Sequence, residues 1–187
     1  MNIVGFIASP RKNGNTAWVV NKILEGAKEQ GAKTEAWYSN ELDIKPCRAC
    51  MGCVQNNRCV MNDDMQRLYG ALKNADALVL GAPLYMGQMS AQAKLFTDRL
   101  FAQITPRFSP RFKEENAGKK LILAFTQGNP DAGKFQTYYD YTKNMFQLLE
   151  FDVKDLIVVT GTRNGPASEQ EGLHAAMKDA GSSLATG

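Results

Sequence analysis

The stretch from Asn2 to Gln30, NIVGFIASPRKNGNTAWVVNKILEGAKEQ, carries the pattern on which the fold depends. It begins with a short β-rich apolar run, Asn2–Ala8, and continues through a polar turn. From Thr16 onward, apolar residues recur every three to four positions, which is the period of an amphipathic helix: Ala17, Val20, Ile23, Leu24 and Ala27. Gly31 follows the last turn, as glycine commonly does at a helix C-terminus. The stretch therefore predicts one strand–loop–helix unit.

The rest of the chain repeats this alternation. Four further strands are predicted, at 33–38, 76–81, 120–126 and 153–160. Helical patterns separate or follow them, at 63–74, 90–101, 134–150 and 167–184. The run DALVLG at 76–81 is almost continuously apolar, which is typical of a strand buried on both faces. Together these units predict an α/β fold, an open five-stranded parallel sheet with helices on both faces, in a single domain over residues 1–187.

Ligands of such sheets bind at the carboxyl ends of the strands, so the loop after the first strand is a candidate site. Ser9, Asn15 and Thr16 offer hydrogen-bond donors, and Arg11 adds positive charge. The first N–H groups of the following helix also favour an anion, so the loop suits a phosphate. The alternative is a polar turn with Thr16 as an ordinary N-cap. The loop matches neither G-x-x-x-x-G-K-[ST] nor G-x-G-x-x-G, which disfavours an NTPase or a dinucleotide-binding fingerprint.

All the cysteines of the chain lie within thirteen residues, with the spacing C-x2-C-x2-C-x5-C: Cys47, Cys50, Cys53 and Cys59. They belong to a segment without regular period, residues 39–62, which follows the second predicted strand. Four thiolates this close can converge on a soft ion, so an iron–sulfur cluster or a structural zinc is expected. Reduced or disulfide-paired cysteines without a metal are the alternative.

Composition and charge narrow the function classes. The chain has 187 residues, 44% of them hydrophobic, and a net charge of +3. This charge is too small to indicate a nucleic-acid partner, and no apolar run approaches the about 20 residues of a membrane span. A cytoplasmic protein is therefore expected. The only histidine, His174, is expected at the surface, and the long connection at 103–118 is expected to be functional or mobile.

Four motifs resemble those of one known family. Ser9-Pro10-Arg11 with Gly14-Asn15-Thr16 is similar to the FMN-phosphate loop of the NADPH-dependent FMN reductase branch of the flavodoxin-like superfamily. After the third predicted strand, the segment 83–90 resembles the P-x-Y loop that lies against the isoalloxazine, and 93–99 matches a K-x-F-x-D-R helix. The cysteine motif resembles that of the iron–sulfur flavoprotein subgroup, which carries one [4Fe–4S] cluster and one FMN per subunit.

The resemblance implies a role for each matching residue. The FMN phosphate is expected to lie on Ser9, Arg11, Asn13, Asn15 and Thr16. The flavin ring is expected between two loops, made by Pro83, Leu84, Tyr85, Met86 and Gly87 on one side and by Thr126, Gln127 and Gly128 on the other. The cluster is expected on Cys47, Cys50, Cys53 and Cys59. Lys94, Asp98 and Arg99 are interpreted as structural, with an Asp–Arg pair tying down a neighbouring loop.

Three functions stay open on this basis. The first is an FMN-dependent oxidoreductase with a [4Fe–4S] cluster, which moves electrons between NAD(P)H or a ferredoxin-like donor and an acceptor. The second is an NAD(P)H-dependent FMN or quinone reductase without a cluster, and the third is a non-catalytic, flavodoxin-style electron carrier. No protein side chain is needed as a catalytic acid or base at a flavin. The resemblance also implies a homodimer or homotetramer.

Overall fold

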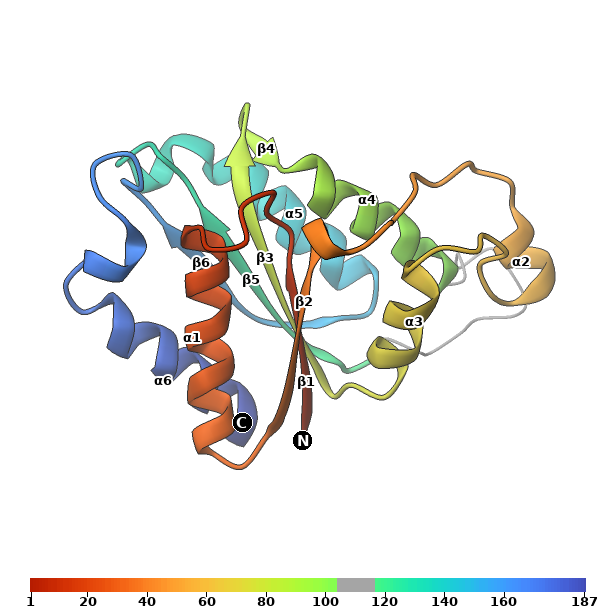
Figure 1. The fold of residues 1–187 in the computed structure, drawn as a ribbon, viewed down its shortest axis with the longest axis horizontal. Coiled ribbons are helices and arrows are strands. Elements are labelled where there is room, and N and C mark those ends of the chain that lie inside the picture. The colour runs from red at the N-terminus through yellow and green to blue at the C-terminus, as the bar shows by residue number, and fades with distance from the viewer. Residues whose placement is uncertain (104–116) are drawn as a thin grey trace.

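The fold is an α/β sandwich whose sheet is mostly parallel (Figure 1). The computed structural model describes residues 1–103 and 117–187. Five strands pair in parallel in the order β2-β1-β3-β5-β6. Their bounds are Asn2–Ile7 for β1, Lys33–Tyr38 for β2, Ala77–Tyr85 for β3, Lys120–Thr126 for β5 and Asp152–Val159 for β6. This order is that of flavodoxin-like sheets, in which ligands bind where the strand order reverses, between β1 and β3.

The prediction of five strands was wrong by one, because the sheet has six. The additional strand, β4 (Gln88–Met89), pairs antiparallel with the end of β3. Met86 and Gly87 form the connecting turn with φ angles of 50° and 80°. Two consecutive positive φ angles are the geometry of a tight two-residue hairpin. β3 therefore runs on to Tyr85 rather than ending at Gly81, and the predicted flavin loop is a hairpin.

Helices cover both faces of the sheet (Figure 1). Their bounds are Asn15–Glu29 for α1, Gly52–Asn56 for α2, Met65–Lys73 for α3, Ala91–Arg99 for α4, Gln136–Leu148 for α5 and Leu173–Thr186 for α6. The described residues also contain four 3₁₀ turns: η1 (Ser39–Glu41), η2 (Leu100–Ala102), η3 (Ala132–Phe135) and η4 (Ala167–Glu169). α1 and α6 lie on one face, and α3, α4 and α5 lie on the other. The segment with the cysteines and α2 projects sideways beyond α3.

Alternate residues of the central strands build two separate apolar cores. In β3, Leu78 and Leu80 face α3, α4 and α5, whereas Ala77 and Val79 face α1 and α6. All four are at most 2% exposed. Burial on both faces explains the continuous apolar run in the sequence, because a strand between two helix layers has no solvent face on which to place polar residues.

Glycines allow α1 and α6 to approach each other closely. A Cβ atom on Gly181 of α6 would lie 1.8 Å from the carbonyl oxygen of Ile23, and one on Gly26 of α1 would lie 2.0 Å from that of Lys178. Contacts this short are impossible for a side chain, so both positions require glycine. The helix pair is therefore held by backbone-to-backbone packing.

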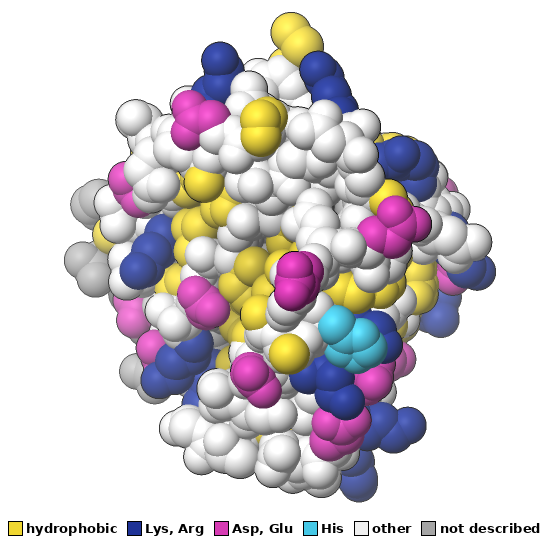
Figure 2. All heavy atoms as spheres, turned by 90° about the vertical axis from the view of Figure 1, so that its left-hand side faces the viewer, with side chains coloured by type: hydrophobic (Ala, Val, Ile, Leu, Met, Phe, Trp, Pro, Cys, Tyr) yellow, Lys and Arg dark blue, Asp and Glu magenta, His cyan; other side chains and the backbone are white. Residues whose placement is uncertain are grey.

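The predicted elements agree with the observed ones except at their ends. Asp64 is the N-cap residue of α3. The segment 39–62, predicted to lack a regular period, contains η1 and the short helix α2 in addition to irregular chain. Most of the 103–118 connection lies outside the described residues. His174 is exposed on α6, as expected. Figure 2 shows the side of the molecule that carries this helix, where basic and acidic side chains are interspersed. No helix in residues 1–103 or 117–187 is long and apolar enough to cross a membrane.

Candidate functional site

The loop between β1 and α1 presents uncapped helix N–H groups next to polar side chains. Gly14 is the N-cap residue of α1, and no side chain in the described part of the chain caps this helix. Ser9 is 3% exposed, and its hydroxyl accepts a hydrogen bond from the N–H of Arg11 at 3.2 Å. The interpretation of Thr16 as the N-cap is wrong, because Thr16 lies inside the first turn. The loop therefore has donors to offer to an anion.

Buried side-chain contacts hold this loop against the neighbouring strand end. The hydroxyls of Thr16 and Thr126 lie 2.7 Å apart. Asn15 accepts a hydrogen bond at its side-chain oxygen from the N–H of Ala167, at 2.9 Å. The predicted phosphate-loop residues are thereby linked to the end of β5 and to the segment after β6.

A polar cavity of about 380 Å³ lies beside the loop. Arg11, Asn13, Gly14 and Asn15 form one wall, and residues 162–166 form the other. Sequence reasoning missed this second wall, which contains Arg163. The segment with Arg163 follows the last strand of the sheet. This position could have indicated a ligand-binding role, because loops at the carboxyl ends of parallel strands carry ligand sites. The cavity brings two arginines from opposite ends of the chain to one place.

The β3–β4 hairpin lies at the same edge of the sheet. Pro83 is buried and Leu84 is half-buried, while Tyr85 is 43% exposed and Met86 is fully exposed at the turn. Ser90, just after β4, donates its hydroxyl to the carbonyl oxygen of Ala8 at 2.6 Å and accepts the N–H of Ala93 at 3.2 Å. This one side chain joins the end of β1, the hairpin and the start of α4.

The loop after β5 is stabilised by the side chain of Gln127, which is 2% exposed. The amide of Gln127 donates to the carbonyl oxygens of Asn129 and Asp131 and accepts from the hydroxyl of Tyr139. Burial raises the pKa of Tyr139 to about 12, so this hydroxyl stays protonated as a donor at neutral pH. The backbone N–H of Gln127 is also bonded, to Val159. Gln127 thus shapes the loop through contacts within the protein.

Gly128, the next residue, leaves room for Arg163. A Cβ atom at position 128 would lie 2.7 Å from the Cγ of Arg163. The arginine therefore packs directly over a loop that the resemblance assigns to the flavin. The loops after β1, β5 and β6 meet in this way at one place, although they are far apart in sequence.

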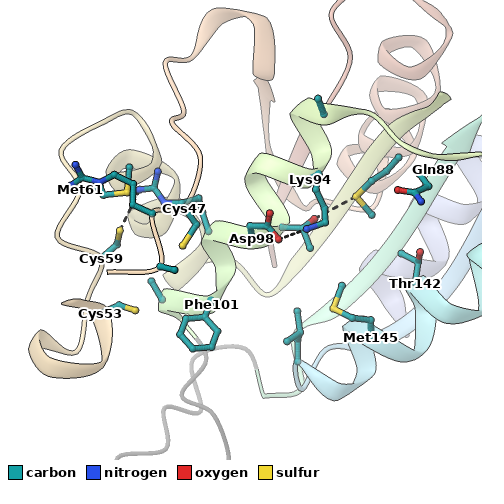
Figure 3. A pocket seen from close by; sticks show the side chains of 18 of the residues that line it. Cys47, Cys53, Cys59, Met61, Gln88, Lys94, Asp98, Phe101, Thr142 and Met145 are labelled. Carbon is teal, nitrogen blue, oxygen red and sulfur yellow. Dashed lines mark hydrogen bonds and ion pairs between the residues drawn. The ribbon is translucent and has the colours of Figure 1, made fainter. Parts of the chain in front are cut away.

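A larger cavity, of about 1280 Å³, extends from the cysteine segment along α4 and α5 to the hairpin (Figure 3). Figure 3 shows Cys47, Cys53 and Cys59 at one end and Gln88, Thr142 and Met145 toward the other. The lining includes all four cysteines together with Tyr85 and Met86 of the hairpin. Among the residues that the structure describes, it shares none with the 380 Å³ cavity. The predicted metal ligands and part of the predicted flavin loop therefore face one space.

The cysteine segment has an unusual backbone. Ala49, Met51 and Asn57 have φ angles of 49°, 56° and 58°. Met51 and Asn57 are the residues immediately before and after the short helix α2. All four cysteines are free thiols, and burial raises the pKa of Cys53. Within residues 1–103 and 117–187, no group of three or more His, Cys, Asp or Glu side chains lies in an arrangement that could hold a metal ion.

Arg99, at the end of α4, connects this segment to the fold. Its guanidinium forms an ion pair with Asp63 at 2.5 Å, and both side chains are at most 1% exposed. It also donates to the carbonyl oxygen of Lys45 at 2.8 Å and to the sulfur of Cys59 at 3.4 Å. Burial opposes ionisation of Asp63, but the hydrogen bonds from Arg99 and from the N–H of Lys45 outweigh it and hold the pKa of that carboxyl below its usual value.

These contacts explain the K-x-F-x-D-R pattern of α4. Arg99 ties down the cysteine segment, in agreement with its structural interpretation, but its partner is Asp63 rather than the adjacent Asp98. Asp98 instead pairs with Lys94 on the exposed side of the helix, at 2.5 Å. Phe96 stacks on Phe6 of β1 with ring centroids 4.1 Å apart, so the helix is anchored to the sheet.

Comparison with known proteins identifies the family. The family model described as NADPH-dependent FMN reductase matches residues 1–176. An iron–sulfur flavoprotein of Methanosarcina thermophila is 38% identical over 141 residues, which are 75% of this chain and 72% of that protein. One from Methanocaldococcus jannaschii is 35% identical over 99 residues, which are 53% of this chain and 51% of that protein.

Among solved structures, the NAD(P)H:quinone oxidoreductase from Methanothermobacter marburgensis has the same fold. It superimposes with a TM-score of 0.78 at 18% identity, with 98% of each chain covered. The fold, the strand order and the family match agree with one another. The chain therefore belongs to the NADPH-dependent FMN reductase family of flavin-dependent oxidoreductases.

Proposed function

We propose that this protein is an FMN-dependent oxidoreductase that also carries a [4Fe–4S] cluster and moves electrons between a reduced donor, NAD(P)H or a ferredoxin, and an acceptor. One observation carries the proposal: all four free cysteines line the same cavity as Tyr85 and Met86 of the hairpin. By its resemblance to the family's P-x-Y loop, we take that hairpin as one wall of the flavin site. A cluster on these cysteines and a flavin on this hairpin would face the same cavity.

The residues around the first loop fit FMN. The uncapped N–H groups of α1, Arg11 and Arg163 suit a phosphate, because the helix dipole and the guanidinium forks both favour an anion. The hairpin would hold one face of the ring, with Tyr85 as an aromatic wall and Gly87 allowing close approach of the backbone. Bound FMN supplies the redox chemistry and accepts either a hydride or single electrons.

The donor set also fits a cluster. Four thiolates are the ligands that [4Fe–4S] clusters take, and these four lie on one short segment. The guanidinium of Arg99, which donates to the sulfur of Cys59, would add a cationic donor beside the negatively charged group. Because the thiols do not form a metal-ligating group in the structure, the proposal requires the 47–59 segment to close around the cluster. Relatives named iron–sulfur flavoproteins support this assignment.

The decisive test is the content of iron, sulfide, zinc and FMN in protein purified without oxygen. The proposal expects about four irons and one FMN per chain, with a broad visible absorbance that bleaches on reduction. Replacement of all four cysteines by serine should remove the iron and leave FMN binding intact. If the wild-type protein contains FMN but no iron, the proposed cluster is wrong.

A second candidate is an NAD(P)H-dependent FMN or quinone reductase without a cluster. The likeness of the fold to an NAD(P)H:quinone oxidoreductase from Methanothermobacter marburgensis supports it. This function predicts that the variant in which serine replaces all four cysteines oxidises NAD(P)H as fast as the wild-type protein. Tight FMN binding with negligible NAD(P)H turnover would instead indicate an electron carrier.

We also propose that the protein is a homodimer or homotetramer. Exposed apolar side chains gather around the 1280 Å³ cavity, among them Met51, Val60, Tyr85, Met86 and Tyr141. Exposed apolar surface of this kind marks contacts between proteins. Light scattering coupled to size-exclusion chromatography tests the proposal, and a monomer at micromolar concentration would contradict it.

A further inference from the structure

Arg99 is a buried cation whose guanidinium has three partners within residues 45–63. The residue is 2% exposed. One terminal nitrogen bonds to Asp63 at 2.5 Å and to the carbonyl oxygen of Lys45 at 2.8 Å. The other bonds to Asp63 at 3.0 Å and to the sulfur of Cys59 at 3.4 Å. The guanidinium that holds Asp63 and Lys45 thus also donates to the sulfur of a predicted cluster ligand.

The helix that carries Arg99 begins at the flavin-side hairpin. Ser90 caps α4 and bonds to Ala8, and Phe96 stacks on Phe6. The helix of nine residues spans about 13 Å at about 1.5 Å per residue. A short helix anchored at its start, its middle and its end behaves as a rigid element. The guanidinium is therefore held in a fixed position relative to the hairpin.

We infer that Arg99 is a positioning residue that orients the Cys59 thiolate and raises the reduction potential of the proposed cluster. The inference rests on the proposed function. Hydrogen bonds to ligand sulfurs are among the factors that set cluster potentials. A cationic N–H donor favours the reduced cluster, which carries one more negative charge, over the oxidised one. Burial strengthens this effect, because little solvent screens the guanidinium.

The test compares three variants of the full-length protein, purified without oxygen. Arg99→Lys keeps a charge but lacks the fork that serves Asp63 and Cys59 together. The double variant Asp63→Asn/Arg99→Gln removes the donor without leaving an unpaired buried charge. Lys94→Gln, on the exposed side of the same helix, is the matched control. Iron per chain, FMN per chain and the cluster midpoint potential by redox titration with electron paramagnetic resonance are measured for each.

The expected result is a shift of the cluster potential to more negative values, larger in the double variant than in Arg99→Lys, with the FMN content unchanged. Lys94→Gln should retain the wild-type potential. A purely structural role of Arg99 would leave the potential unchanged wherever iron is retained, and that result would overturn the inference. Loss of iron from both Arg99 variants, with iron retained in the control, would mean that Arg99 only holds the segment in place, and it would contradict the inference. A wild-type protein without iron would overturn the proposed cluster itself, which distinguishes the two failures.

Discussion

The hydroxyls of Thr16 and Thr126 lie 2.7 Å apart in the interior and join two loops that are 110 residues apart in sequence. Thr16 belongs to the first turn of α1, and Thr126 ends β5. Both residues are at most 5% exposed. The contact fixes the proposed phosphate loop relative to the loop on the other side of the proposed flavin ring.

Loss of this contact should weaken both stability and FMN binding. Thr126→Val keeps the side-chain shape but leaves the buried hydroxyl of Thr16 without its partner. We expect the free energy of unfolding to fall by about 1 to 3 kcal/mol, as measured by urea denaturation. Fluorescence titration should show weaker FMN binding. Thr126→Ser, which keeps a hydroxyl, is the control and should stay close to wild type. Equal stability of the valine variant would mean that the Thr16 hydroxyl has another partner.

Arg163 should contribute to affinity only for flavins that carry a phosphate. Removal of a charge-assisted hydrogen bond costs about 1.5 kcal/mol or more, so Arg163→Gln should weaken FMN binding about tenfold. Binding of riboflavin, which lacks the phosphate, should be unchanged. Lys12→Gln is the control, because the ammonium of Lys12 already pairs with Glu41. An equal loss of affinity for FMN and riboflavin would exclude a phosphate contact by Arg163.

The close packing of α1 on α6 should make Gly181 intolerant of any side chain. The Cβ atom of Gly181→Ala would meet the carbonyl oxygen of Ile23, so the helices must move apart. We expect a loss of about 1 to 3 kcal/mol in the free energy of unfolding. Gly70→Ala in α3 is the matched control, since no atom of the described residues lies within 4 Å of its Cβ position. This control should gain about 0.5 to 1 kcal/mol, because alanine favours the helix. A neutral Gly181→Ala variant would contradict the observed helix packing.

The buried ion pair predicts a pH dependence of stability. Asp63→Asn should cost about 3 to 5 kcal/mol at neutral pH, because it leaves the buried guanidinium of Arg99 without its counter-charge. The pKa of Asp63 is lower in the folded protein than its usual value of about 3.9. Its contribution is therefore fully present above about pH 4 and is lost as the pH falls through the folded-state pKa.

Chemical denaturation of iron-free protein at several pH values measures this effect. The difference in unfolding free energy between wild type and Asp63→Asn should narrow below about pH 4. If this difference in unfolding free energy stays constant down to the lowest pH measured, Asp63 is not ionised in the folded protein. Asp98→Asn, which removes an exposed carboxylate from the same helix, should show a much smaller difference at every pH.

The sequence by itself determined the order of the elements and the class of the fold. The period of apolar residues in α1 and the continuous apolar run of β3 are local signals, because each reflects which faces of one element are buried. The motif at Ser9–Thr16 and the spacing of the four cysteines are also local. They were sufficient to indicate the family and the candidate ligands of FMN and of a cluster.

The tertiary structure alone decided which distant residues meet. Arg99 contacts Cys59 across 40 residues, and Ala167 contacts Asn15 across 152. Arg163 packs over Gly128, and glycines of α1 and α6 contact each other's helix backbone. These contacts also join residues that are far apart in the sequence. The hairpin strand β4 was missed because two residues are too few for a period. A sequence pattern reports the burial of single faces, whereas these contacts depend on how whole elements are packed, which no local pattern specifies.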